Sequence, residues 1–216
     1  MQQWSVVVPA KRLVAAKTRL TPLTAALGDE LPAGHADLVL ALLADTVSAA
    51  LAAPAVHLLL VVTDDPQAAE VVTALGAHTV GDEPDRGLNA ALAHGARRAR
   101  EMTAGPVAAL SSDLPALRPE ELTAALQAAA AVPRAFVADA AGSGTTLLAV
   151  REGELEPRFG PGSAAAHTAG GATPLNGDWP GLRQDVDTPG DLHTACWIGV
   201  GPRTAGFLSA ISWSSG

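Results

Sequence analysis

Positive charge is concentrated in one short segment of this chain. Residues 11–19 carry four basic side chains and no acidic one: Lys11, Arg12, Lys17 and Arg19. The two lysines are the only ones in the sequence, and the remaining ten basic residues face 22 acidic ones. Ammonium and guanidinium groups are the side chains that hold phosphate oxygens. The segment is a candidate for binding a polyphosphate, although a solvated basic loop would have the same composition.

Two aspartate-containing segments could bind a divalent cation. Asp113 closes an apolar run, and Asp185 and Asp187 alternate along an extended stretch, which would place both on one face. Mg²⁺ takes one or two carboxylates together with phosphate oxygens of a substrate. Asp113 could instead serve a turn or a helix cap. Asp191 fits the capping box of a helix starting at Thr188, and Asp187 could also be structural, so Asp185 is the better candidate ligand.

Three glycine-containing segments could let a ligand approach the backbone. Gly87 and Asn89 open a predicted helix, where the Asn89 amide can both donate to and accept from a base or ribose, although a plain helix start looks the same. The turns 142–144 and 159–163 could offer N–H groups to a small anion, or could be ordinary turns. No histidine is spaced for zinc, and we expect His167 to be a surface or packing residue.

The elements that must position these residues alternate between strand and helix. Strands are predicted at 4–8, 56–63, 77–80, 106–111, 134–138, 145–151 and near 182–186, and helices at 38–53, 64–75, 87–102, 118–131 and from 188. This order, with strands apolar on both faces, predicts an α/β fold with a mostly parallel sheet. Ligands of such sheets bind at the carboxyl ends of strands, where the candidate residues lie.

Composition excludes several classes of protein. A chain of 216 residues with 48% apolar and 17% charged residues predicts one globular domain over residues 1–216. A net charge of −8 argues against nucleic acid or an anionic membrane as a partner. The single Cys196 excludes an internal disulfide, and the sequence shows neither an 18-residue apolar run nor a secretory leader. We expect a soluble cytoplasmic protein whose oligomeric state stays open.

Five segments, taken in order, resemble the CofC/FbiD guanylyltransferases of coenzyme F-420 biosynthesis. They are residues 9–20, 113–117, 142–145, 159–163 and 185–189, with the sequences PAKRLVAAKTRL, DLPAL, GSGT, FGPGS and DVDTP. The resemblance spans residues 6–192. Ser112 stands where the family pattern has glycine, whereas the aspartate that follows it is intact.

The resemblance implies a mixed, mostly parallel sheet with helices on both faces, a nucleotidyltransferase fold of the glycosyltransferase-A-like kind. It also implies GTP and a small phosphorylated carboxylic acid as substrates. By similarity, Asp113 and Asp185 hold Mg²⁺ and are catalytic together with Lys17, while Thr145, Gly160 and Ser163 hold the acid. The residues singled out above add candidate nucleotide contacts from Lys11, Arg19, Gly87 and Asn89.

The implied reaction is the attack of an acceptor phosphate oxygen on the α-phosphorus of GTP, with release of pyrophosphate. An acceptor that is already charged needs no general base, so catalysis reduces to positioning and charge neutralisation. Phosphoenolpyruvate is the favoured acceptor, on the wording of the motifs, with 2-phospho-L-lactate next. Two alternatives stay open: a related nucleotidyltransferase using another nucleotide, 3-phosphoglycerate or a sugar phosphate, and a nucleotide-binding protein without catalysis.

Overall fold

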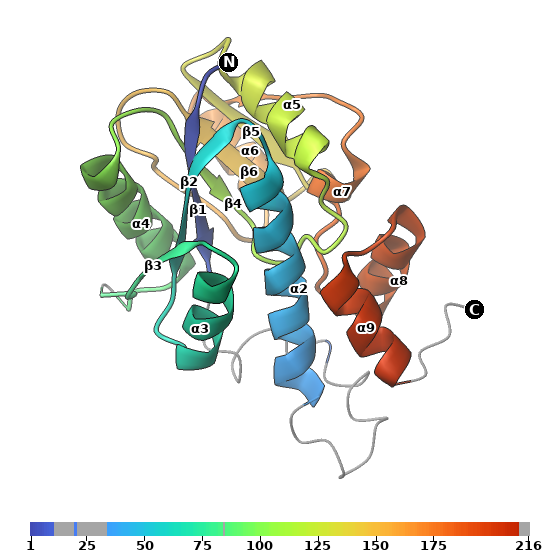
Figure 1. Ribbon diagram of the computed structural model, residues 1–216. Coiled ribbons are helices and arrows are strands. Elements are labelled where there is room, and N and C mark those ends of the chain that lie inside the picture. Colours follow the sequence, from blue (N-terminus) through green and yellow to red (C-terminus); the bar gives the residue numbers. More distant parts are fainter. Residues whose placement is uncertain (11–19, 21–33, 84, 212–216) are drawn as a thin grey trace.

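The computed structural model describes residues 1–10, 20, 34–83 and 85–211. Along the chain the elements are β1 (Trp4–Pro9), α2 (Gly34–Ala52), β2 (Val56–Val62), α3 (Pro66–Ala74), β3 (His78–Val80), α4 (Leu88–Met102), β4 (Val107–Leu110), α5 (Pro119–Ala129), β5 (Arg134–Ala138), β6 (Thr145–Val150), α6 (Ser163–Ala169), β7 (Thr173–Pro174), α7 (Pro180–Arg183), α8 (Pro189–Ile198) and α9 (Pro202–Ala210) (Figure 1). One domain over residues 1–216 stays a prediction.

The strands form one seven-stranded mixed sheet in the order β3-β2-β1-β4-β6-β5-β7. Neighbouring strands are parallel except that β6 runs antiparallel to both β4 and β5. Every residue of β1, β4 and β6 is buried, as expected for strands covered on both faces. The predicted mostly parallel sheet is therefore confirmed, and the carboxyl ends of β1 to β5 meet the start of β6 at one edge.

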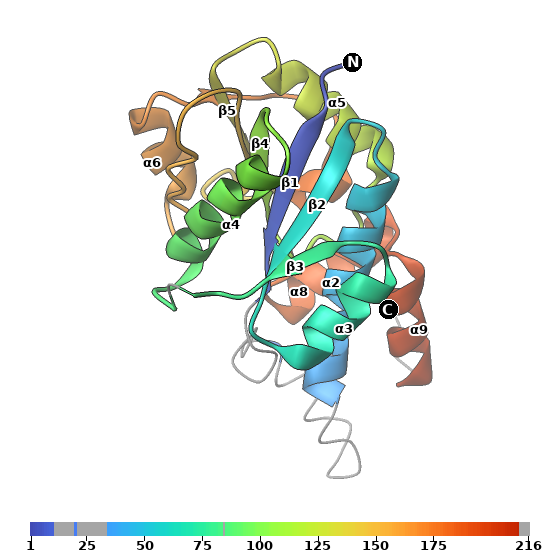
Figure 2. The ribbon, with the colours of Figure 1, turned by 60° about the vertical axis from the view of Figure 1, so that its left-hand side comes forward.

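Helices cover both faces of the sheet (Figures 1 and 2). Because side chains alternate along each strand, successive residues of one strand pack against helices on opposite faces. Val6 and Val8 of β1 belong to the core that includes residues of α2, α3 and α5. Val7, between them, packs instead into a second core with Leu92 of α4 and Ala164 of α6. The helix α4 carries a glycine at this contact, since a Cβ on Gly95 would collide with Val7 and Val62 of the strands.

The helices α8 and α9 pack beside α2 in a third core that also contains Leu20 and Val186. A buried carboxylate fixes α9 there: Asp45 of α2 accepts hydrogen bonds from the backbone N–H of Arg203 at 3.1 Å and of Thr204 at 2.8 Å. Among the described helices, α2 alone is long and apolar enough to cross a membrane, with a hydropathy of 1.5. One side of it, with Leu38, Leu42 and Val47, is buried in the protein core.

The strand predicted near residues 182–186 is wrong. Residues Pro180–Arg183 form the short helix α7. The buried carboxylate of Glu121, on α5, accepts from the backbone N–H of Gly181 at 3.2 Å and of Leu182 at 2.9 Å. Such bonds satisfy the first amides of a helical turn, so a side chain some sixty positions away stabilises helix where local composition favours a strand.

Candidate active site

Strand direction brings the acidic and the hydroxyl-bearing segments to the same edge of the sheet. Because β6 runs antiparallel to β4, the chain leaving β4 lies beside the start of β6. The backbone N–H of Ser111 donates to the carbonyl of Thr146 at 2.8 Å. The segment of Asp113 and the residue Thr145 therefore lie on adjacent strands at the edge where ligands of such sheets bind.

The segments of Asp113 and Asp185 lie side by side. The carbonyl oxygen of Asp113 accepts from the backbone N–H of Val186 at 3.1 Å. The Asp113 side of this contact is anchored by Thr46 of α2, whose hydroxyl accepts from the N–H of Leu114 at 2.9 Å and donates to the carbonyl of Leu42 at 2.8 Å. Asp113 is buried and Asp185 is half-buried.

The carboxylates of Asp113 and Asp185, called the aspartate pair below, have the chemistry of a site for a hard cation. In the part of the chain that the structure describes, no group of three or more His, Cys, Asp or Glu side chains is arranged to hold a metal. Two carboxylates suit Mg²⁺, which keeps several of its positions for water and substrate phosphates. Asp113 does not cap a helix, because the N-cap of α5 is Arg118.

The residues next to the aspartate pair have structural explanations. Asp191 forms a capping box with Thr188 at the start of α8, which confirms its predicted structural role. Asp187 is exposed, and its N–H donates to the Asp191 carboxylate at 3.2 Å. Only Asp85 and Glu156 have positive φ among the described non-glycine residues, so the backbone at Ser112 needs no glycine.

Arginine 183 ties the segment that carries Asp185 to the end of β5. Its guanidinium donates to the carbonyl of Ala138 at 3.2 Å and to that of Asp139 at 3.0 Å, and its own carbonyl accepts from the N–H of Ala140 at 2.8 Å. Sequence reasoning missed Arg183, as it missed Thr46 and Glu121. All three act through backbone groups far away in the chain, and no local pattern marks such contacts.

The turn 142–144 does not offer its N–H groups to a ligand and is an ordinary turn, one of the two alternatives that the sequence left open. The carboxylate of Asp139 accepts from the N–H of Ser143 at 2.9 Å and of Gly144 at 2.8 Å. The N–H of Gly142 donates to the Asp139 carbonyl at 3.1 Å. The carboxylate of Asp139 thus takes up the N–H groups of this turn, and the turn leads directly into Thr145 at the start of β6.

The segment 159–163, unlike Gly144 in the turn 142–144, has free space beside its glycine residues. Gly160 and Gly162 have φ of 125° and 74°, which favour glycine, and a Cβ added at either would meet nothing within 4 Å. Ser163 is only 1% exposed, yet its hydroxyl has no hydrogen-bond partner among the described residues. A buried hydroxyl without a partner costs free energy, which a bound ligand would recover.

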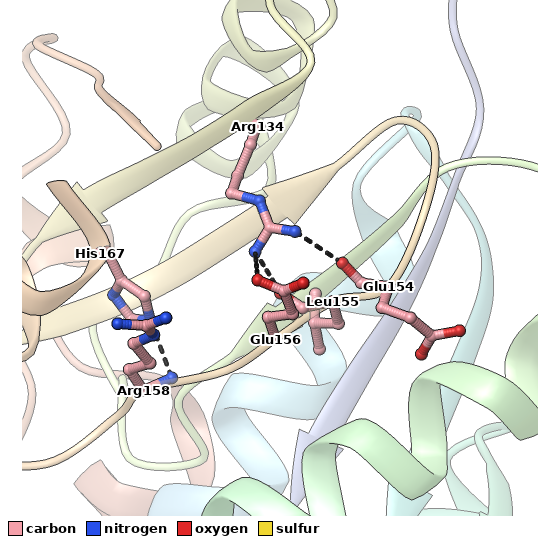
Figure 3. Close-up of polar contacts among 6 residues, drawn as sticks. All are labelled: Arg134, Glu154, Leu155, Glu156, Arg158 and His167. Carbon is pink, nitrogen blue, oxygen red and sulfur yellow. Dashed lines mark hydrogen bonds and ion pairs between the residues drawn. The ribbon is translucent and has the colours of Figure 1, made fainter. Parts of the chain in front are cut away.

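His167 links this segment to Thr145. Its Nδ1 lies 2.9 Å from the Thr145 hydroxyl oxygen. Its Nε2 accepts from the backbone N–H of Arg158 at 3.0 Å, as Figure 3 shows. Burial, together with the charges of Arg134 and Arg158, lowers the pKa of His167 to about 4. The sequence predicted a surface or packing residue; its spacing of four from Ser163, which puts both on one helix face, was the available signal.

Phenylalanine rings hold the His167 ring in place. The centre of the Phe136 ring, on β5, lies 5.8 Å from that of His167, and the centre of the Phe159 ring lies 5.4 Å away in an edge-on arrangement.

Arg134 orders the chain that leads to Arg158. It donates to the carbonyls of Leu155 at 2.9 Å and Glu154 at 2.7 Å (Figure 3). Thr145, Ser163 and His167 are called the hydroxyl cluster below.

The side chain of Asn89 is engaged with the protein itself. Its Oδ1 accepts from the N–H of Phe159 at 2.8 Å, and its Nδ2 donates to the carbonyl of the same residue at 3.0 Å. The amide therefore clamps the segment 159–163 onto the start of α4. Gly87 is the N-cap of α4, with φ of 88° and open space around it, so the predicted helix start is confirmed.

The predicted phosphate-binding residues Lys11, Lys17 and Arg19 lie outside the described residues. The described residues on either side of this segment are Ala10 and Leu20. The N–H of Ala10, just after β1, donates to the carbonyl of Val62 at 2.9 Å. Leu20 is buried in the core that contains Val186, the residue next to Asp185.

Comparisons with known proteins identify the family of this chain. The family described as "Guanylyl transferase CofC like" matches residues 4–214. A phosphoenolpyruvate guanylyltransferase of Geodermatophilus obscurus is 64% identical over 217 residues, covering 100% of this chain and 99% of the relative. One of Streptomyces scabiei is 55% identical over 210 residues, covering 94% of each chain.

A solved structure of a nucleotidyl transferase from Methanothermobacter thermautotroptrophicus has the same fold. The TM-score is 0.57 at 19% sequence identity, with 97% of this chain and 100% of that chain covered. The sequence match to the Geodermatophilus relative covers the whole chain and so spans all segments of the candidate site. The chain is a nucleotidyltransferase and belongs to the family of CofC-like guanylyl transferases.

Proposed function

We propose that this enzyme transfers GMP from GTP to phosphoenolpyruvate. A phosphate oxygen of phosphoenolpyruvate forms a bond to the α-phosphorus of GTP, and the bond from that phosphorus to the bridging oxygen of the β-phosphate breaks, releasing pyrophosphate. The relatives named phosphoenolpyruvate guanylyltransferase support this choice of substrates. We further propose that the reaction belongs to coenzyme F-420 biosynthesis in the cytoplasm.

The observation that carries the proposal is the backbone contact between Asp113 and Val186. It brings two carboxylates from distant parts of the chain to the edge of the sheet that also holds the hydroxyl cluster. Asp113 and Asp185 would hold Mg²⁺, which supplies positive charge to phosphate oxygens when bound. The arrangement suits a reaction between two anions, whose mutual repulsion must be neutralised.

The other substrate contacts follow from the position of each segment. Lys17, with Lys11 and Arg19, would face the phosphates of GTP. The segment that carries them is positively charged, although the whole chain has a net charge of −8. Gly87 lets the nucleotide approach the start of α4. The open backbone at Gly160 and the hydroxyls of Thr145 and Ser163 would hold the carboxylate and phosphate of the acid.

A panel of substrates tests the proposal. Purified enzyme with Mg²⁺ is given each of the four ribonucleoside triphosphates together with phosphoenolpyruvate, 2-phospho-L-lactate or 3-phosphoglycerate, and pyrophosphate and the mass of the product are measured. We expect pyrophosphate and a guanylylated product from GTP and phosphoenolpyruvate. Preference for CTP or for another acid would overturn the assignment, and binding of GTP with no pyrophosphate from any pair would indicate a protein without catalysis.

A further inference from the structure

The direction of one hydrogen bond in the hydroxyl cluster follows from chemistry alone. The Nε2 atom of His167 lies 3.0 Å from the backbone N–H of Arg158. A backbone N–H can only donate, so this nitrogen must carry a lone pair and no proton. The proton of the neutral ring is therefore on Nδ1, and it points at the hydroxyl oxygen of Thr145, 2.9 Å away.

Thr145 must then direct its own hydrogen elsewhere. Its oxygen already accepts from His167, and this oxygen has no other hydrogen-bond partner in the described part of the chain. Thr145 is 7% exposed, so bulk water has little access to it. A buried hydroxyl that cannot donate to its neighbour is prepared to donate to a ligand, and a ligand that rewards such a donor is an anion.

The surroundings preserve this arrangement. The rings of Phe136 and Phe159 flank the imidazole, so it cannot turn over without moving the core. Ser163, one helical turn before His167, adds a second buried hydroxyl without a partner among the described residues. The backbone N–H of Ser163 donates to the carbonyl of Gly160 at 3.0 Å, so the open backbone of Gly160 lies next to this end of the cluster.

We propose that His167 is a positioning residue that fixes the polarity of the Thr145 hydroxyl, so that its hydrogen is presented to an oxygen of the phosphorylated acid. With the opposite tautomer, Thr145 would donate to the ring and turn its lone pairs toward the acid, which would repel an anion. This inference rests on the proposed function only for the identity of the acid.

Two substitutions of His167 separate its two hydrogen bonds. In His167→Asn, the amide nitrogen takes the place of Nδ1 and can still donate to Thr145. In His167→Gln, the amide oxygen reaches the place of Nε2 and can still accept from Arg158, but the donor to Thr145 is lost. We expect His167→Gln to raise KM for phosphoenolpyruvate about tenfold, the loss of one hydrogen bond to a charged group, and His167→Asn to raise it less.

A double-mutant cycle tests whether His167 acts through Thr145. Thr145→Val should raise the same KM, and adding His167→Gln to it should cause little further loss, because coupled residues are not additive. The KM for GTP should change less than twofold throughout. His57→Gln, an exposed histidine at the opposite end of β2, is the matched control. Additive losses, or equal effects on both substrates, would show that His167 has only a structural role.

A measurement on the unmodified enzyme keeps the proposal testable if the variants fold poorly. Nitrogen-15 chemical shifts of the imidazole report which ring nitrogen carries the proton, and we expect Nδ1–H. A proton on Nε2 would overturn the proposal whatever the enzyme's activity. Thermal stabilisation by phosphoenolpyruvate, present in the unmodified enzyme and lost in Thr145→Val, tests acid binding even if no product forms, and equal stabilisation of both would contradict the proposal.

Discussion

The aspartate pair and the hydroxyl cluster lie at one edge of the sheet but are built in opposite ways. The segments of the aspartate pair are brought together by backbone contacts, such as the bond between Asp113 and Val186. The hydroxyl cluster is held by side chains, and its groups are neutral. Under the proposed function, the aspartate pair would depend on positive charge from a bound cation and from the basic segment, whereas the hydroxyl cluster would need an anion to satisfy its donors.

The largest effect that tests this contrast is expected at the aspartate pair. Asp113→Asn or Asp185→Asn keeps the shape of the side chain but removes the charge that would hold Mg²⁺. We expect pyrophosphate release to fall at least about a thousandfold, since charge stabilisation is a dominant catalytic term, while the circular dichroism spectrum stays unchanged. Asp187→Asn, at the exposed neighbour, is the control. Near-normal turnover in both variants would remove the metal from the proposal.

Lys17→Ala should have the next largest effect. Loss of one ammonium group facing the phosphates of GTP is expected to lower kcat/KM for GTP about a hundredfold. The control is Arg98→Ala, which removes an exposed cation of α4 that is paired with Glu101. If steady-state kinetics give the same loss for both variants, the effect comes from net charge and not from the position of Lys17.

Ser163→Ala should separate binding from stability within the hydroxyl cluster. The hydroxyl is buried without a partner among the described residues, so its removal is not expected to lower the Tm. If this hydroxyl binds the acid, KM for phosphoenolpyruvate should rise about tenfold. A fall in Tm with unchanged KM would mean that the hydroxyl serves the fold.

Asn89→Ala distinguishes a clamp from a nucleotide contact. The variant loses both hydrogen bonds to Phe159 and frees the segment 159–163. We therefore expect KM for phosphoenolpyruvate to rise several-fold, roughly 1 kcal/mol per lost bond at most, with a smaller change for GTP. Steady-state kinetics with each substrate varied in turn decide the matter: a rise in KM for GTP alone would support the nucleotide contact first predicted from sequence.

The smallest expected effect is the pH dependence of stability. The folded protein holds the pKa of His167 at about 4, below its ordinary value of 6.5. Between these values the unfolded chain binds a proton that the folded protein does not, so stability falls as pH falls. Denaturant titrations from pH 7 to pH 4 should show this fall, and it should be smaller in His167→Asn. Equal slopes would place the pKa of His167 near its ordinary value.

Much of the fold could be predicted from local pattern. Runs such as Val6–Val8 and Leu58–Val62 are apolar at every position, which is typical of strands covered on both faces. The same pattern placed Asp113 directly after a strand. It failed at residues 180–183, because the helical turn there depends on the carboxylate of Glu121, a contact with no trace in the local sequence.

The amino-acid sequence by itself determined which chemical groups follow the strands: cations after β1, a carboxylate after β4, and glycine and hydroxyl residues around β6. Only the tertiary structure decided which of these groups are already satisfied. The N–H of Gly144 donates to the Asp139 carboxylate, and the amide oxygen of Asn89 accepts from the N–H of Phe159. The hydroxyl of Ser163 has no hydrogen-bond partner among the described residues. The reason is physical, because a hydrogen bond depends on where its partner lies in space, and the partner of Asn89 lies 70 residues away along the chain.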